Sequence, residues 1–206
     1  MTITASGVSL FTNFEDPLKD SASVFTEAEE RIAMIPRLIL RRTDDLVVVD
    51  SVAILEGMAK DLNVSKADVL LVVFDPALFE DVRRHVAGTN KPFELLRERG
   101  DLAAVKRARK GGKYLLALPD YVGGLEFAGV VIAGIDEGRV PPFGRSETNE
   151  SRHFLNFSYH NKLYVTVTRA KYRLDLVVNE QRGPSPLLRA ARQRDLLSVI
   201  ESSQLF

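Results

Sequence analysis

The chain has 206 residues with 28 Lys and Arg against 28 Asp and Glu, so its formal net charge is zero, which argues against nucleic-acid binding driven by overall charge. Hydrophobic residues make up 45% of the sequence, as in a folded domain, and the absence of cysteine excludes disulfides, thiol nucleophiles and Cys-based zinc sites. Residues 1–10 lack the pattern of a signal peptide and no segment approaches the roughly 18 apolar residues of a membrane helix, so we expect a cytoplasmic protein without a membrane partner.

The N-terminal segment, residues 1–40, is less regular than the rest and predicts an irregular or helical lead before a main domain at 41–206. Within the lead, residues 27–40 predict a helix interrupted at Pro36, because proline disfavours helical geometry in the residue before it. The main domain is expected to begin with a short strand at 46–49. A helix at 52–62 follows, with Asp50 or Ser51 capping its first turn.

The clearest predicted strand is 69–74, which is apolar at every position. Such a run is typical of a central parallel strand that is covered on both faces. Asp75-Pro76 ends the strand, and apolar residues then recur at helical spacing through 77–86 until Gly88. This segment predicts one complete βα unit.

The same alternation continues to the end of the chain and predicts an α/β domain with a mostly parallel central sheet and helices on both faces. Residues 119–127 are expected to form a turn and residues 136–149 a surface loop. The further strands are predicted at 93–96, 114–118, 129–135 and 172–178, and the further helices at 102–110, 151–168 and 187–200.

Two short motifs carry more information than the fold pattern. The first is Gly124-Leu125-Glu126-Phe127, followed by an apolar strand, and the second is Leu163-Tyr164-Val165-Thr166-Val167-Thr168-Arg169-Ala170-Lys171. Glu137-Gly138-Arg139-Val140-Pro141 lies between them. In order and spacing they closely resemble motifs V and VI of the Rep/UvrD-type superfamily 1 DNA helicases.

The resemblance covers about residues 65–190 and implies a RecA-like three-layer domain, the second, C-terminal motor domain of the helicase. In that family ATP with Mg²⁺ lies between two such domains. By matching position, Arg169 is then the catalytic arginine finger that reaches the γ-phosphate, and Gly124 and Glu126 belong to the nucleotide-binding site. The implied partners are the N-terminal RecA-like half, in the same or a separate chain, and single-stranded DNA.

The sequence departs from this family in two places. A phosphate-binding loop needs Gly-x4-Gly-Lys-Ser/Thr, but Gly111-Gly112-Lys113 lacks the first glycine and is followed by Tyr114, so the chain alone is not expected to hydrolyse ATP. Motif V itself is also altered, because the family usually has Thr-x-His-x-Ala/Ser-Lys before Gly-Leu-Glu-Phe. The residues in those four places here are Leu118, Asp120, Val122 and Gly123, of which Asp120 would repel phosphate.

A basic run between Arg97 and Lys113 is the best candidate for nucleic-acid contact by composition, although a solvated helix face explains it as well. Tyr121 is a candidate for base stacking. Two functions remain open: a motor domain that works with a separate Walker-A half, or a non-catalytic helicase-fold relic that binds DNA or protein as a regulatory module. The nucleic-acid-binding candidates are Arg107, Arg109, Lys110, Lys113 and Tyr121.

Overall fold

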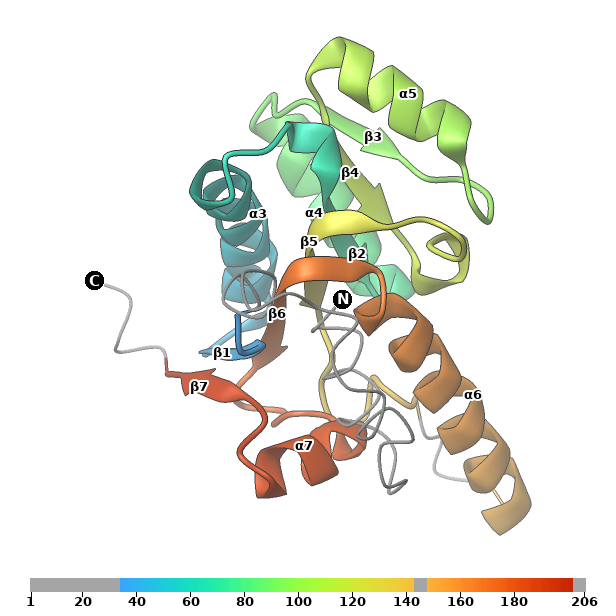
Figure 1. The fold of residues 1–206 in the computed structure, drawn as a ribbon. Helices are drawn as coiled ribbons and strands as arrows, with labels where there is room; N and C mark the ends of the chain where they lie inside the picture. The colour runs from blue at the N-terminus through green and yellow to red at the C-terminus, as the bar shows by residue number, and fades with distance from the viewer. Residues whose placement is uncertain (1–33, 143–147, 202–206) are drawn as a thin grey trace, which may run out of the picture.

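The computed structural model of the chain describes residues 34–142 and 148–201, which form one β-sheet between two layers of helices (Figure 1). Across these residues the sheet has seven strands in the order β3-β4-β2-β5-β6-β1-β7, and every neighbouring pair is parallel. The strands are β1 (Arg37–Arg41), β2 (Val69–Val73), β3 (Phe93–Leu95), β4 (Tyr114–Ala117), β5 (Phe127–Ala133), β6 (Ala170–Asn179) and β7 (Ser198–Ile200).

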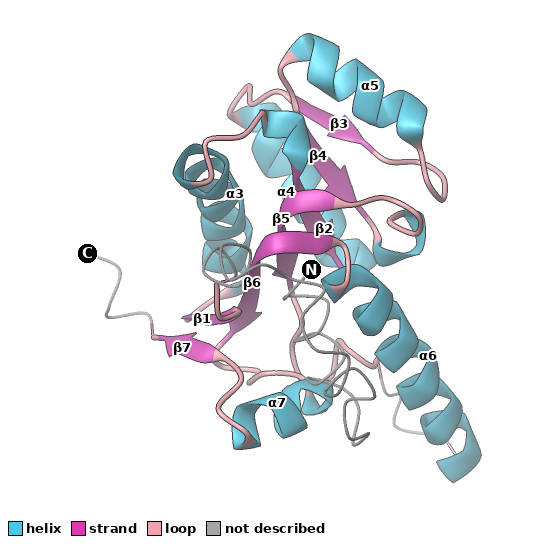
Figure 2. Ribbon diagram, in the orientation of Figure 1, coloured by secondary structure: helices cyan, strands magenta, loops and turns pink. Residues whose placement is uncertain are grey.

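Five α-helices among the described residues cover the two faces of the sheet (Figure 2). Helices α3 and α4 pack on one face, and α5, α6 and α7 pack on the other. This three-layer arrangement confirms the predicted α/β, RecA-like fold class. The helices are α3 (Asp44–Asp61), α4 (Pro76–Gly88), α5 (Leu102–Gly111), α6 (Asn149–Val167) and α7 (Arg189–Gln193), and the short 3₁₀ helices are η1 (Lys66–Asp68), η2 (Pro119–Tyr121) and η3 (Pro186–Leu188).

The predicted βα unit is confirmed as β2 and α4. All five residues of β2 are buried, as expected for a central parallel strand. Asp75 then caps α4, because its carboxylate accepts the amide of Leu78 at 2.8 Å, and Pro76 occupies the first helical turn, where no intrahelical amide partner is needed. The long strand β5 is likewise buried throughout, which places it beside β2 in the middle of the sheet.

The predicted strand at 46–49 is wrong, because these residues lie in α3. Thr43 caps that helix and its hydroxyl accepts the amide of Leu46, so neither Asp50 nor Ser51 is the cap. The β-branched run Val47-Val48 faces the core together with Val52. Packing of this apolar stripe against the sheet outweighs the modest preference of valine for strands.

Two further predictions at the ends of the domain are also wrong. Residues 37–40, expected as helix, belong to β1, and the rest of that expected helix falls largely outside the described residues. The expected helix 187–200 is divided into η3, α7 and β7. Both errors have one cause: β1 is sandwiched between β6 and β7, and strand pairing with distant segments overrides local propensity.

Because every strand runs the same way, the sheet has an edge where strands begin and an opposite edge where they end. The segments that precede β5 and β6 therefore meet at the amino edge. The segments that follow β2, β5 and β6 meet at the carboxyl edge. In the part of the chain that the structure describes, no helix is long and apolar enough to cross a membrane.

Candidate functional site

The two sequence motifs meet at the amino edge of the sheet. Gly124 to Leu125 leads into β5, while Arg169 stands immediately before β6, and these two strands are neighbours. The first residues of the strands are in register, Phe127 beside Ala170. In addition, the amide of Phe127 donates to the carbonyl of Arg169 at 2.8 Å. Motifs separated by about forty residues are thus joined by the ladder between β5 and β6.

The guanidinium of Arg169 is fixed by three hydrogen bonds. Its Nε donates to the carbonyl of Val165 at 3.0 Å, Nη1 to the carbonyl of Leu125 at 3.1 Å, and Nη2 to Oγ1 of Thr168 at 3.0 Å. A guanidinium has five N–H groups, so within the described residues one N–H on Nη1 and one on Nη2 remain for a ligand. The side chain is half-buried, which limits its freedom while leaving it accessible.

A pocket of about 370 Å³ opens beside Arg169. Its polar wall holds Gly124 and Glu126, the two residues that the motif resemblance assigned to the nucleotide, together with Arg169. Arg109, which sequence reasoning placed in the nucleic-acid candidates, reaches the same pocket from α5. Leu102 supplies part of the apolar wall. The structure therefore gathers four candidate residues at one place.

Gly124 and Glu126 have different surroundings in this pocket. Gly124 has a φ of +81°, a backbone conformation that favours glycine, and nothing would crowd a Cβ there, so conformation rather than space accounts for the glycine. The Glu126 side chain is 60% exposed and pairs with Lys171 at 2.9 Å. That hydrogen bond lowers the pKa of Glu126 and raises the pKa of Lys171. Glu126 is thus an ionised, paired carboxylate at the rim.

Most of the basic nucleic-acid candidates already have carboxylate partners within the domain. Arg107 and Lys113 both pair with Glu94, at 2.9 and 3.1 Å, and Arg109 pairs with Asp68 at 2.6 Å. Lys110 is exposed in the last turn of α5. Tyr121 is half-buried against the core, which limits the face that it can offer to a base.

The Gly-Gly-Lys segment has no phosphate-binding geometry. Gly112 is the C-cap of α5 with a φ of +59°, and its amide donates back to the carbonyl of Ala108. The segment therefore lies at a helix C-terminus, whose partial charge is negative, whereas phosphates bind at helix N-termini. The ammonium of Lys113 is engaged with Glu94.

A second polar cluster lies at the carboxyl edge, and sequence reasoning missed it. Asp136 is fully buried; it accepts the amide of Asn179 at 2.7 Å and a guanidinium N–H of Arg139 at 2.6 Å. Arg139 also donates twice to Asp44, at 3.0 and 2.6 Å. Burial raises the pKa of Asp136, while the hydrogen bond from Arg139 lowers the pKa of Asp44. The sequence signals for this cluster were Thr43-Asp44 at the start of α3 and the charged loop after β5.

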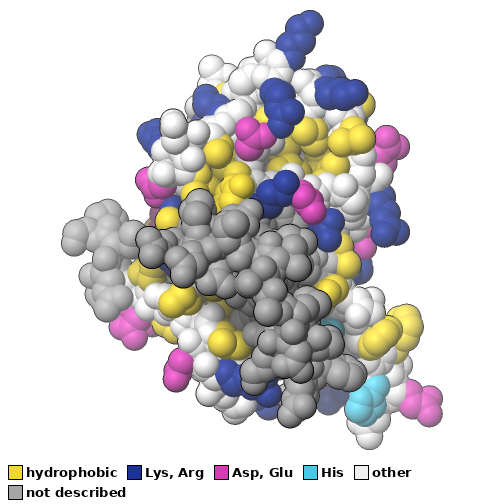
Figure 3. Space-filling model, viewed as in Figure 1, with side chains coloured by type: hydrophobic (Ala, Val, Ile, Leu, Met, Phe, Trp, Pro, Cys, Tyr) yellow, Lys and Arg dark blue, Asp and Glu magenta, His cyan; other side chains and the backbone are white. Residues whose placement is uncertain are grey.

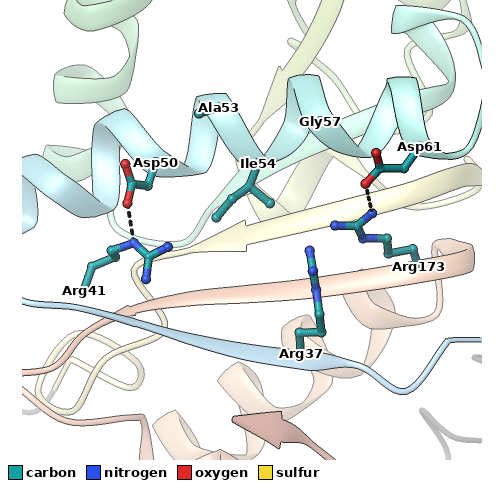
Figure 4. A pocket seen from close by; sticks show the side chains of 8 residues that line it. All are labelled: Arg37, Arg41, Asp50, Ala53, Ile54, Gly57, Asp61 and Arg173. Carbon is teal, nitrogen blue, oxygen red and sulfur yellow. Dashed lines mark hydrogen bonds and ion pairs between the residues drawn. The ribbon is translucent and has the colours of Figure 1, made fainter. Parts of the chain in front are cut away.

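A third group of charges lines a groove of about 370 Å³ between α3 and β1 (Figure 4). Three arginines reach it, and each has a carboxylate partner: Arg37 binds Asp175 through two bonds of 2.6 Å, Arg41 binds Asp50, and Arg173 binds Asp61 at 2.8 Å. The charges in this groove therefore neutralise one another.

No protein-family model and no curated protein matches the sequence. Among solved structures, the chain resembles the C-terminal domain of a possible DNA helicase from Lactobacillus plantarum WCFS1, with a TM-score of 0.62 and 16% identity over 97% of this chain and 95% of that one. An XPD helicase gives a TM-score of 0.49 and 15% identity, covering 80% of this chain and 35% of that chain. Xpd4 from S. tokodaii gives 0.45 and 15%, covering 81% and 38%. At 16% identity, the likeness to the Lactobacillus plantarum domain shows that the two chains share a fold.

Proposed function

We propose that this chain is the C-terminal motor domain of an ATP-dependent DNA helicase of the Rep/UvrD type. In this role it closes over ATP and Mg²⁺ held by an N-terminal RecA-like half that carries the Walker A motif. The observation that supports the proposal most directly is the placement of Arg169. It is rigidly held beside Gly124 and Glu126, and two of its N–H groups point to no acceptor among the described residues.

The residues of the pocket fit a triphosphate from one side. Bound ATP supplies the phosphoryl group whose transfer to water drives a helicase. Arg169 offers planar donors to phosphate oxygens, and the carbonyl of Leu125 keeps that plane fixed. Arg109 also lines the pocket, but its pair with Asp68 offsets its charge, so of the two arginines Arg169 is the one whose charge is not balanced by a carboxylate among the described residues. Positioned positive charge of this kind stabilises the charge that develops during phosphoryl transfer.

Several features require a second half for activity. The Gly-Gly-Lys segment is a helix C-cap, so it does not form a loop that could cradle the β- and γ-phosphates. The pocket beside Arg169 lies at the surface and Glu126 at its rim is 60% exposed, as expected for one wall of a shared site. DNA is the second partner that the motif resemblance implies.

The test is ATP hydrolysis by this chain combined with, or present in one polypeptide with, a Walker-A RecA-like half. Removal of an arginine finger costs about 10³-fold or more in kcat, so Arg169→Ala is expected to abolish most DNA-stimulated hydrolysis. Arg83→Ala, on the exposed surface of α4, is the matched control and should leave the rate unchanged. Arg169→Lys keeps the charge without the planar donors and should rescue little.

Unchanged hydrolysis in Arg169→Ala would contradict the proposal. In that case the alternative function gains support, a helicase-fold module that binds DNA or protein without catalysis. Such a module should associate with its partner equally well with and without nucleotide, which pull-down assays in ATP, in ADP and without nucleotide would show.

A further inference from the structure

The first half of α6 extends away from the body of the domain (Figure 1). No residue of the helix is buried before Leu163. Phe154 and Phe157 are 70% and 66% exposed, which makes them the most exposed large hydrophobic side chains in the described part of the chain. Figure 3 shows the resulting hydrophobic side chains gathered on the projecting helix, with a histidine near them.

Helical geometry places both phenylalanines on the face opposite the core. The buried residues of α6 are Leu163, Thr166 and Val167. Phe154 and Phe157 lie on the other side, and Asn161 follows them at spacings of seven and four residues, so the three share one face. With a rise of about 1.5 Å per residue, the two rings are about 4.5 Å apart along the helix axis.

The same face of α6 ends in a second pocket, of about 210 Å³, which Asn161, Lys162 and Val165 line from the helix. Arg99 lines it from the opposite side, and its guanidinium lies over Gly123: a Cβ on Gly123 would meet Nε of Arg99 at 2.6 Å. Within the described residues, Arg99 has no carboxylate partner.

The charge of this pocket is positive. Asp120 lies in it, but Lys162 holds that carboxylate at 2.9 Å and neutralises it. The unpaired guanidinium of Arg99 therefore sets the net charge at one positive unit. Asp120 and Gly123, where motif V departs from the family pattern, both line this pocket. Two cations line it with them, Lys162 from α6 and Arg99 from the loop before α5.

We propose that this face of α6 and the pocket at its end bind single-stranded nucleic acid, with bases stacked on Phe154 and Phe157 and a phosphate at Arg99. Exposed aromatic rings that continue into a cationic pocket are the combination that single strands require. Charge complementarity favours this occupant at the pocket, where the guanidinium of Arg99 is the surplus cation. The face of the helix adds the amide of Asn161 between the rings and the pocket, and it also carries the carboxylate of Glu150 one turn before Phe154. The proposal rests on the proposed function, of which it specifies the DNA path.

The experiment is fluorescence anisotropy of a labelled oligothymidylate of about 15 nucleotides, a length suited to single-strand sites, with the full chain. The double variant Phe154→Ala/Phe157→Ala should bind at least about tenfold more weakly, since stacking contributes to every base bound. Val199→Ala, an exposed apolar residue of β7, is the matched control and should bind normally. All three substituted residues are exposed, so the variants are expected to fold.

Two further arms separate stacking from charge. An abasic strand of the same length should bind the unaltered chain more weakly and should not distinguish it from the double phenylalanine variant, because it has no bases to stack. Arg99→Gln should weaken binding of both strands and reduce the dependence of log K on log salt by about one phosphate contact.

Equal affinity of the unaltered chain and the double phenylalanine variant would overturn the proposal. Equal affinity of the unaltered chain for the thymidylate and abasic strands would also overturn it. So would the absence of binding at a protein concentration of about 10⁻⁴ M, the weak limit of the Kd for non-specific contacts. If the double variant changes only self-association or capture of a protein partner, the face docks protein and the proposal is wrong. None of these readouts depends on Arg169, so failure here and failure of the ATPase role are distinguishable.

Discussion

The two edges of the sheet hold arginines of opposite kinds. At the carboxyl edge, Arg139 is 11% exposed and is surrounded by Asp44 and Asp136, with Asp75 4.0 Å away. At the amino edge, Arg169 donates only to neutral acceptors and no carboxylate pairs with it among the described residues. Arg139 is thus neutralised by the chain, whereas Arg169 keeps its full charge.

Under the proposed function, this difference puts the ligand at the edge of the sheet opposite to the one where ligands of parallel α/β sheets usually bind. Ligands commonly bind outside the carboxyl ends of the strands. Here the cluster around Asp136 fills that position with hydrogen bonds between the chain's own side chains, so its role is to fasten the loop after β5 to α3 and β6. The amino edge holds the uncompensated charge, which is where a phosphate gains most.

The largest effect is expected for Arg139→Met, which removes the carboxyl-edge cation. Asp136 would then be a buried carboxylate without its ionic partner, and breaking such a pair costs about 3 kcal/mol or more of unfolding free energy. Urea denaturation measures this loss. Arg84→Met, which breaks an exposed pair with Asp81, is the control and should cost less than about 1 kcal/mol. Similar losses in both variants would refute the contrast between the edges.

A smaller loss of stability is expected for Arg169→Ala. Three hydrogen bonds to neutral acceptors disappear, but the site is half-buried and water can replace them, so the cost is about 1 to 2 kcal/mol. The same denaturation experiment measures it. A loss as large as that of Arg139→Met would show that Arg169 is mainly structural and would weaken its assignment to phosphate.

The smallest effect is expected for Glu126→Gln. The pair with Lys171 is exposed, so its contribution is below about 0.5 kcal/mol. Because Lys171 lowers the pKa of Glu126, this contribution is present above the usual glutamate pKa of about 4.3 and is lost as the pH falls through the lowered value. Denaturation of both proteins at pH 7 and pH 3 should show a small difference in unfolding free energy that is smaller at pH 3 than at pH 7. A difference that grows in acid would contradict the ion pair.

Local sequence patterns correctly predicted the segments of the fold in which several independent signals indicate the same element. The buried strand β2 and the capped helix α4 have an apolar run, an Asp-Pro boundary and helical spacing in immediate succession. The motif resemblance likewise brought Gly124 and Arg169 into one site, and the neighbouring strands β5 and β6 explain how. This prediction came from the family resemblance, because the spacing of Gly124 and Arg169 in the sequence does not by itself indicate that they are close in space.

Predictions failed where distant segments decide the local structure. Val47 and Val48 have the residue types of a strand, but they fill the space between α3 and the sheet. The same holds at the sites: Arg109 enters the pocket of Arg169 because α5 packs beside the amino edge, and Arg139 meets Asp44 although 95 residues separate them. Such pairings depend on the topology, which no short window of sequence contains.

The position of β1 has a consequence for how the domain acquires its structure. This strand, first in the described sequence, hydrogen-bonds to β6 on one side and to β7 on the other, and its registered partners lie 138 and 161 residues later. Contacts of such separation slow folding, because loop-closure entropy is lost before any pairing is gained. On the ribosome, β1 therefore remains without a neighbouring strand until β6 emerges, and a chain interrupted before β6 would leave the core-facing residues Leu38 and Ile39 without their strand partners and prone to aggregation.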